Sequence, residues 1–306
     1  MQTVTAASQS TGSHSTESHS AASNPTTGAH RVTHERRPTA ANIDVFGLTH
    51  QGLVRTTNED QFLIASLHKS LDVHSSSLPI ESLGNLHGAP EGYLFVVADG
   101  VGGSRDGEVA SGTAVRSVAQ YVAHCLHCYN GRGGSSGDAE FLQELQKAML
   151  DSDKHVREDA GGSATTLTMV MAVWPRAYLI HVGDSRCYRL RDNALQLLSK
   201  DQTMAAALVE AKALTPEQAE KSQWRDVLMS SLGGNETTPL TVPSHIDWND
   251  VMLLCTDGLS KHVSDDELQA ALQKVQSAEQ TARELVQLAL DRGGSDNVTA
   301  IVGRLR

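Results

Sequence analysis

Residues 93–100, Tyr-Leu-Phe-Val-Val-Ala-Asp-Gly, form a continuous apolar run that ends in an aspartate and a glycine. An uninterrupted apolar run of this length is typical of a strand buried on both faces. The glycine after the aspartate lets the backbone turn sharply or approach a neighbour closely. Residues 251–258, Val-Met-Leu-Leu-Cys-Thr-Asp-Gly, repeat this design. For either segment alone an ordinary Asp-Gly turn is the simpler interpretation. The rest of the chain decides whether these aspartates only make turns or belong to a functional site.

Working outward from these runs, strand-like and helix-like segments come in groups. Period-two alternation or short apolar runs predict further strands over 43–49, 61–66, 167–173, 177–182, 187–190 and 298–305. The first two of these strands are expected to pair with each other. Apolar spacing of three and four predicts helices over 115–129 and 138–158, and capping boxes at Ser264 and Ser277 begin two more. Groups of strands with helix pairs between them indicate an α+β layered domain with antiparallel sheets.

The ends and interruptions of this pattern suggest the domain limits. Residues 1–41 consist mainly of Ser, Thr, Ala, His and Gly, a composition that predicts a disordered tail. We expect the folded domain over 42–306, with His68–Gly92 as an inserted surface loop and 201–234 as a separate subdomain. The pair Cys125 and Cys128 lacks a second pair that would complete a zinc site, so these cysteines are expected to be structural.

Composition excludes several classes of protein. The net charge of −11 argues against nucleic-acid binding, which needs a basic surface. The sequence contains no apolar run long enough to span a bilayer and no basic-then-apolar leader, and four cysteines are too few for a disulfide scaffold. We therefore expect a cytoplasmic protein without membrane or nucleic-acid partners.

More acidic residues lie at the predicted strand ends. Glu59 and Asp60 precede a strand, Asp184 follows one, and Asp296 precedes the last. Together with Asp99 and Asp257 they form five separate acidic sites without a histidine or cysteine pattern among them. Oxygen-only donors suit Mg²⁺ or Mn²⁺, whereas zinc would recruit His or Cys.

Five motifs in this order carry a resemblance. They are R-T-T-N-E-D (55–60), A-D-G-V-G-G (98–103) with G-E-V-A-S (107–111), H-V-G-D-S-R (181–186), C-T-D-G-L (255–259) and G-S-D-N-V-T (294–299). In order and spacing, over about 44–306, the chain resembles the metal-dependent protein phosphatase (PPM, type 2C) family, and A-D-G-x-G-G is similar to its bacterial branch. The resemblance implies a four-layer αββα sandwich, in which helix pairs flank two antiparallel sheets and the metal site lies at one end of the sheets.

The resemblance also implies roles for the matching positions. Asp99 would bridge two metal ions, with the Gly100 carbonyl on the second, and Asp184 with Asp257 would bind a third. Arg55 would grip the substrate phosphate. Asp257 and Asp296 would complete the first ion's ligands. Glu59 and Asp60 would hold the second ion directly or through waters. Asn297 would brace the metal loop. Paired cations lower the pKa of a shared water, which would attack phosphorus directly.

Three functions are compatible with these residues. The implied one is a monomeric serine/threonine phosphatase acting on phosphorylated proteins and opposing a bacterial kinase. A weakly active phosphoprotein-binding module would be expected to lack some metal acids, and here all are present. A hydrolase for small phosphorylated molecules is the third.

The chain departs from the family pattern in the 201–234 segment, which resembles the family's flap beside the active site. Asp201-Gln202-Thr203 stands where bacterial members often have D-H-S, and Arg225-Asp226 where they often have Arg-Asn. These departures concern flap contacts and substrate preference rather than the metal acids.

Overall fold

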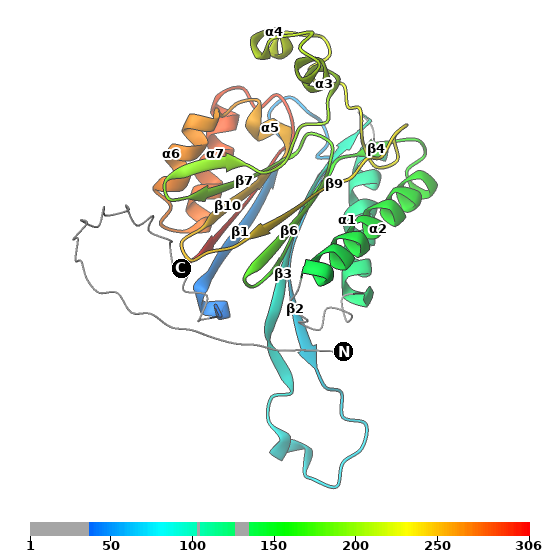
Figure 1. The fold of residues 1–306 in the computed structure, drawn as a ribbon, viewed down its shortest axis with the longest axis vertical. Helices are drawn as coiled ribbons and strands as arrows, with labels where there is room; N and C mark the ends of the chain where they lie inside the picture. The colour runs from blue at the N-terminus through cyan, green and yellow to red at the C-terminus, as the bar shows by residue number, and fades with distance from the viewer. Residues whose placement is uncertain (1–36, 103–104, 126–134) are drawn as a thin grey trace, which may run out of the picture. The chain divides into compact units, whose positions relative to one another are not determined.

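Figure 1 shows the computed structural model, which describes residues 37–102, 105–125 and 135–306. Nearly all of the predicted tail, and Cys128, lie outside these residues. Arg37 donates hydrogen bonds to the carbonyl oxygens of Pro90 and Glu91, and the short 3-10 helix η1 (Ala40–Asn42) follows. Residues 36–306 form one compact unit.

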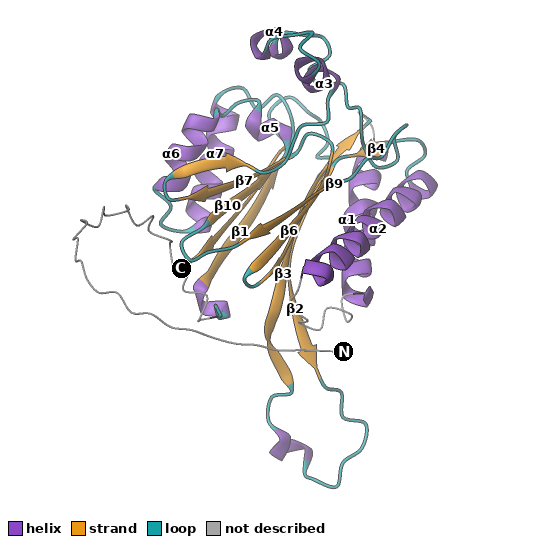
Figure 2. Cartoon of the chain, viewed as in Figure 1, coloured by secondary structure: helices purple, strands orange, loops and turns teal. Residues whose placement is uncertain are grey.

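Two antiparallel sheets lie at the centre of this unit (Figure 2). The first runs β1 (Ile43–His50), β11 (Val298–Leu305), β10 (Val251–Cys255), β7 (Arg186–Arg191) and β8 (Ala194–Leu197). The second runs β2 (Asp60–Ser70), β3 (His87–Val101), β5 (Leu167–Val173), β6 (Arg176–Val182) and β9 (Leu240–His245), and the short β4 (Ala164–Thr165) pairs with β3.

A pair of helices covers the outer face of each sheet (Figures 1 and 2). Helices α1 (Arg105–Cys125) and α2 (Ser135–Asp159) pack on the second sheet, and α6 (Asp265–Gln273) and α7 (Ala278–Asp291) on the first. The predicted four-layer αββα sandwich is confirmed. No helix in the described ranges has the length and apolar character needed to cross a membrane.

Strand β3 shows why the opening run is apolar on both sides. Leu94 and Val96 belong to the core between the second sheet and its helices, whereas Phe95 and Val97 belong to the core between the two sheets. The prediction of a strand buried on both faces is therefore confirmed.

Two sequence expectations about strands were wrong. The strands at 43–49 and 61–66 do not pair with each other: β1 pairs with β11 and β2 with β3, so the two strands lie in different sheets. The predicted surface loop His68–Gly92 is also shorter, because the β2–β3 ladder continues past two irregularities to Ser70 and His87. Periodicity marks a strand but does not identify its partner.

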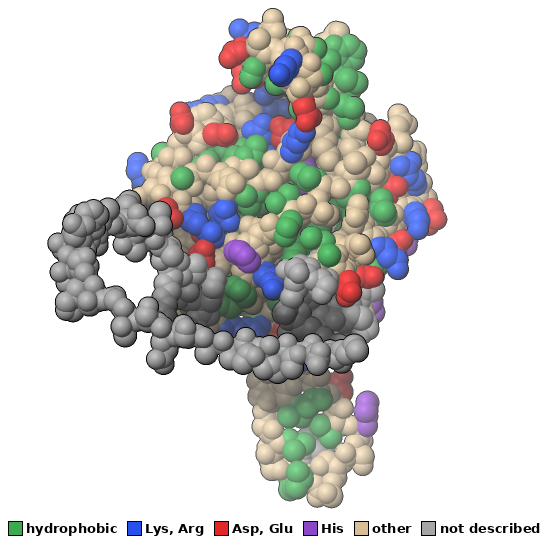
Figure 3. All heavy atoms as spheres, in the orientation of Figure 1, with side chains coloured by type: hydrophobic (Ala, Val, Ile, Leu, Met, Phe, Trp, Pro, Cys, Tyr) green, Lys and Arg blue, Asp and Glu red, His purple; other side chains and the backbone are tan. Residues whose placement is uncertain are grey.

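The remaining tip of the β2–β3 hairpin projects from the end of the molecule opposite α3 and α4 (Figure 1). It contains the short 3-10 helix η2 (Ile80–Leu83) and exposes Leu71, Val73 and Leu78. Hydrophobic side chains are visible on this projection in Figure 3.

The segment predicted as a flap lies beyond the other end of the sheets (Figure 1). It carries α3 (Met204–Glu210) and α4 (Pro216–Glu220), and α4 starts with a capping box at Thr215. Backbone hydrogen bonds from Met204 to Val227 and from Met229 to Gln202 hold its two ends together.

Candidate metal centre

Acidic residues from both sheets meet at the end that carries the flap. Asp60 and Asp99 face each other in the register of β2 and β3. Asp257 follows β10 as the first residue of α5 (Asp257–Ser260), and Asp296 lies just before β11. Asp184 follows β6. Strands of alternating direction thus deliver five aspartates to one end of the sandwich, as the sequence predicts.

Asp60 joins the two sheets directly. Its Oδ2 accepts hydrogen bonds from Thr256 Oγ1 at 2.8 Å and Thr299 Oγ1 at 2.6 Å, and both threonines belong to the first sheet or its edge. The Oδ1 atoms of Asp60 and Asp257 are buried and have no hydrogen-bond partner among the described residues. A buried carboxylate oxygen without a donor is costly unless a cation faces it.

Glycines allow the loops of the centre to approach each other closely. A side chain at Gly100 would place its Cβ 2.2 Å from the Gly107 carbonyl oxygen. A Cβ at Gly258 would lie 1.9 Å from the Asn297 carbonyl oxygen. Both contacts are with backbone, so they could not relax by moving a side chain. These distances explain why each strand-end aspartate is followed by glycine.

Asn297 ties three loops together. Its Nδ2 donates to the carbonyl oxygens of Gln51 and Thr57, both at 2.8 Å, and its Oδ1 accepts from the Glu59 backbone amide at 2.8 Å. The residue is buried, at 5% exposure. The bracing role that the resemblance implies for Asn297 fits these contacts, which place Glu59 beside the other acids.

The carboxylates raise one another's pKa. Burial, opposed by the hydrogen bonds from Thr299 and Thr256, raises the pKa of Asp60 to about 7. Burial and the nearby charge of Asp257 raise the pKa of Asp184 to about 8. Burial raises the pKa of Asp99 well above its usual range, and the charges of four aspartates raise it further: Asp60, Asp257, Asp184 and Asp296. Such a cluster favours either protons or bound cations.

A pH dependence follows for the metal-free protein, which is expected to lose stability as the pH rises from about 6.5 to about 8. In this window the unfolded chain has already ionised Asp60 and Asp184, whereas the folded protein releases these two protons only as the pH passes about 7 and about 8. Buried His181, with a pKa lowered to about 4, opposes this trend only below the pKa of the unfolded side chain, about 6.5. Melting temperatures in EDTA across this range provide the test, and a constant or rising value contradicts the expectation. Added Mn²⁺ should flatten the profile.

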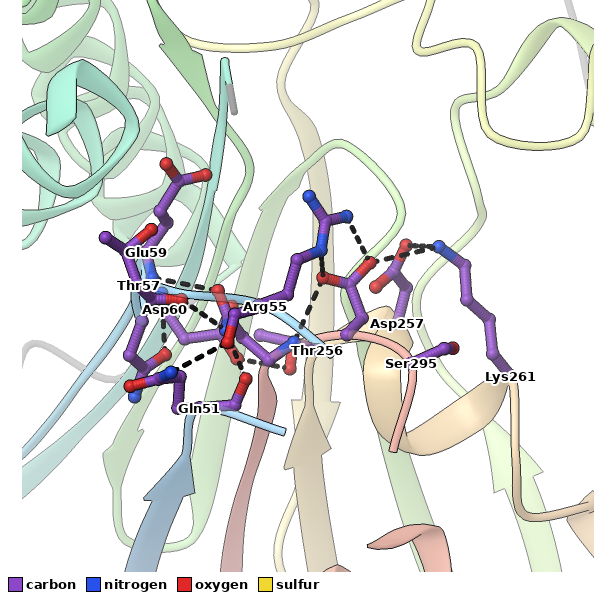
Figure 4. Close-up of polar contacts among 12 residues, drawn as sticks. Gln51, Arg55, Thr57, Glu59, Asp60, Thr256, Asp257, Lys261 and Ser295 are labelled. Carbon is purple, nitrogen blue, oxygen red and sulfur yellow. Dashed lines mark hydrogen bonds and ion pairs between the residues drawn. The ribbon is translucent and has the colours of Figure 1, made fainter. Parts of the chain in front are cut away.

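Two basic side chains stand among the acids (Figure 4). Arg55 pairs with Asp296, with Nε to Oδ1 at 2.8 Å and Nη2 to Oδ2 at 2.9 Å, and is 46% exposed. Lys261 reaches Asp257 from the other side, with Nζ to Oδ2 at 2.5 Å. In this arrangement no three acidic, histidine or cysteine side chains of the described chain are grouped as ligands of one ion. The side chains of Arg55 and Lys261 thus pair with carboxylates that a metal ion would otherwise bind.

The donor set nevertheless fits hard divalent cations. All predicted ligands offer oxygen, two have buried oxygen atoms without a donor, and the acids are close enough to raise one another's pKa. Glu59 and Asp60 are buried. The other four acids are partly exposed, so the centre opens to solvent at Asp99, Asp184, Asp257 and Asp296. Sequence reasoning missed the roles of Lys261, Thr256 and Thr299, although both threonines lie inside quoted acidic motifs, 255–259 and 294–299.

The unusual residues at the start of the flap have definite partners. Asp201 forms an ion pair with Arg186, with Oδ2 to Nη2 at 2.7 Å. The Gln202 side chain accepts from the Gly183 amide and donates to the Thr238 carbonyl oxygen, and Thr203 caps α3. These residues fasten the flap next to Asp184.

Comparisons with known proteins agree with this geometry. A family model described as protein phosphatase 2C matches residues 83–298. The serine/threonine protein phosphatase PstP of Mycobacterium tuberculosis is 36% identical over 215 residues, which cover 68% of this chain and 40% of PstP. The chain thus spans less than half the length of that relative.

Solved structures match a larger share of this chain than the 68% that the sequence match to PstP covers. The crystal structure of the M. tuberculosis phosphatase PstP/Ppp has a TM-score of 0.68 and 31% identity, and covers 86% of this chain and 99% of its own. The PstP catalytic domain in complex with two manganese ions has a TM-score of 0.65 and 32% identity, with 86% and 98% covered.

Proposed function

The chain belongs to the protein phosphatase 2C family, and we propose that it is a metal-dependent phosphatase that hydrolyses phosphoserine and phosphothreonine in proteins. The observation that carries the proposal is the meeting of acidic residues from both sheets beside an exposed arginine at one end of the sandwich. Manganese in the related PstP catalytic domain supports Mn²⁺ as the metal, with Mg²⁺ as the alternative.

In this proposal the chain holds two core ions and a third. Asp99 would contribute to both core sites and the Gly100 carbonyl to the second, and Asp184 with Asp257 would hold the third ion. Asp257 and Asp296 complete the first core site, and Glu59 and Asp60 the second. When bound, such ions would supply activation of water and neutralisation of phosphate charge.

Arg55 has the chemistry and position for binding the substrate phosphate. Its guanidinium lies at the open side of the centre and already pairs with two carboxylate oxygens of Asp296. The same planar fork matches two oxygens of a phosphate. With Asp296 serving as a metal ligand, Arg55 would be free to orient the phosphoryl group for in-line attack.

The space beside the centre favours a side chain on a polypeptide as substrate. A cavity of about 600 Å³ lies between the flap and the sheet ends, and Asp184, Asp226 and Asp257 are among its lining residues. A cavity of this volume can hold a phosphorylated side chain together with flanking residues. We infer that the chain works as a monomer in the cytoplasm on the products of a cognate kinase, with 42–306 as the catalytic domain, 201–234 as its flap and 1–41 as a tail.

A direct assay tests this function. Purified protein with Mn²⁺ is expected to release phosphate from phosphothreonine and phosphoserine peptides, and EDTA should abolish the release. A phosphorylated sugar at the same concentration is expected to react more slowly, because it lacks flanking residues for the flap. Faster turnover of the sugar would instead indicate a metabolite hydrolase. Turnover that persists in EDTA, or failure to bind Mn²⁺, would contradict the proposal.

A further inference from the structure

Lys261 connects the flap to the proposed metal ligands. Its Nζ lies 2.5 Å from Asp257 Oδ2, 3.3 Å from Asp226 Oδ1 and 3.7 Å from Asp296 Oδ2. Asp257 and Asp296 are proposed ligands, whereas Asp226 belongs to the flap. One ammonium group therefore spans the border between the centre and the flap.

The local structure holds Lys261 in this position. The residue ends α5, one turn after Asp257, and its backbone amide donates to the Asp257 carbonyl oxygen. Its side chain is only 22% exposed. Burial alone would lower the pKa of Lys261, but the charges of Asp257, Asp226 and Asp296 raise it, so the amine is cationic at neutral pH.

Asp226 is the partner of Lys261 on the flap, at a position where the bacterial branch that this chain resembles often has asparagine. Its side chain is 61% exposed, and it lines the same cavity as Asp257 and Lys261. The neighbouring backbone is fastened to the start of α3 by hydrogen bonds from Ala205 to Trp224 and from Met204 to Val227. A force on Asp226 therefore acts on the base of the flap.

We propose that Lys261 is a positioning residue that couples metal binding to the flap. It competes with divalent cations for Asp257 and Asp296, and a bound cation shifts it toward Asp226, because like charges repel and that carboxylate is the one left to it. The inference rests on the proposed metal centre and adds a regulatory link to it. Metal loading would then draw the flap base toward the centre.

Calorimetric titration of the full chain with Mn²⁺ tests the competition. Lys261→Met is expected to bind Mn²⁺ about tenfold more tightly than the wild type, since a competing charge a few ångströms from the ion is removed. Lys261→Arg, which keeps the charge, should remain close to wild type. Lys200→Met is the matched control, because Lys200 pairs with Glu210 on the flap instead. A merely structural role for Lys261 predicts weaker binding in the Met variant, the opposite sign.

A double-mutant cycle tests the link to the flap. Asp226→Asn should weaken Mn²⁺ binding about threefold when Lys261 is present, and have little effect in the Lys261→Met background. Equal weakening in both backgrounds would mean that Asp226 itself binds the ion and would overturn the proposal. Unchanged affinity in Lys261→Met would overturn it as well, while leaving the phosphatase proposal intact. A wild type that binds no Mn²⁺ would overturn both.

Trp224 offers a readout of the flap that is independent of activity. It lies two residues before Asp226 and is 42% exposed. Mn²⁺ is expected to change the tryptophan fluorescence of the wild type, and the change should be absent from Trp224→Phe, Lys261→Met and Asp226→Asn. A full fluorescence change in Lys261→Met would contradict the coupling.

Discussion

Asp99→Asn is expected to lower Mn²⁺-dependent turnover of a phosphothreonine peptide by at least about 1,000-fold, equivalent to about 4 kcal/mol of lost transition-state stabilisation. Asp99 faces Asp60 across the β2–β3 ladder, and its charge also acts on Asp257 and Asp184. Asparagine keeps the shape of the side chain but removes the charge that a bridging ligand must supply. Initial rates at saturating Mn²⁺ measure the effect.

The fold should survive this change. The protein contacts of Asp99 with Thr165 and Thr166 run through its backbone, which asparagine retains. Removing one charge from a crowded acidic cluster should even stabilise the metal-free protein. Asp159→Asn, on the exposed end of α2, is the matched control and should keep wild-type activity. Activity of Asp99→Asn within tenfold of wild type would rule out Asp99 as the bridging ligand.

Asn297→Ala is expected to destabilise the protein by about 3 kcal/mol, because it removes one buried and two partly buried hydrogen bonds and leaves their backbone partners unsatisfied. Those partners are the carbonyl oxygens of Gln51 and Thr57 and the amide of Glu59. The melting temperature should fall by roughly 6–12 °C, on the usual scale for a domain of this size. Thermal unfolding in EDTA measures the loss without a contribution from metal.

The same variant should also bind Mn²⁺ more weakly, since Glu59 and Asp296 lie on either side of the brace. Asn235→Ala, at an exposed position, provides the control for removing an asparagine side chain. An Asn297→Ala protein that melts like the wild type would show that these three hydrogen bonds are replaced by others.

Sequence patterns located the strands that carry the acids. The predicted limits of the strand at 298–305 match β11, and the apolar part of the quoted stretch 251–258 coincides with β10. The pairing of β1 with β11 was not predicted, since the two strands lie at opposite ends of the domain sequence. Local periodicity contains no information about a partner so far along the chain.

The same limit applies to the candidate site. Strand-end aspartates could be recognised because the acid and the strand are neighbours in sequence. The Lys261 contacts could not, because Asp226 and Asp296 approach it from separate loops. The hydroxyl groups of Thr256 and Thr299 on Asp60 were missed for the same reason: each hydrogen bond joins the two sheets.

The position of β11 has a consequence for synthesis of the protein in the cell. This strand lies between β1 and β10, yet it is translated after both. After β1 has been synthesised, about 250 further residues must be added before its partner β11 emerges from the ribosome, which takes roughly 10–50 s at ordinary elongation rates. Asp296 and Asn297 arrive with that strand. A nascent chain therefore lacks the complete set of proposed metal ligands until the fold can close, and translation that stops short of residue 298 is expected to yield a product without the proposed phosphatase activity.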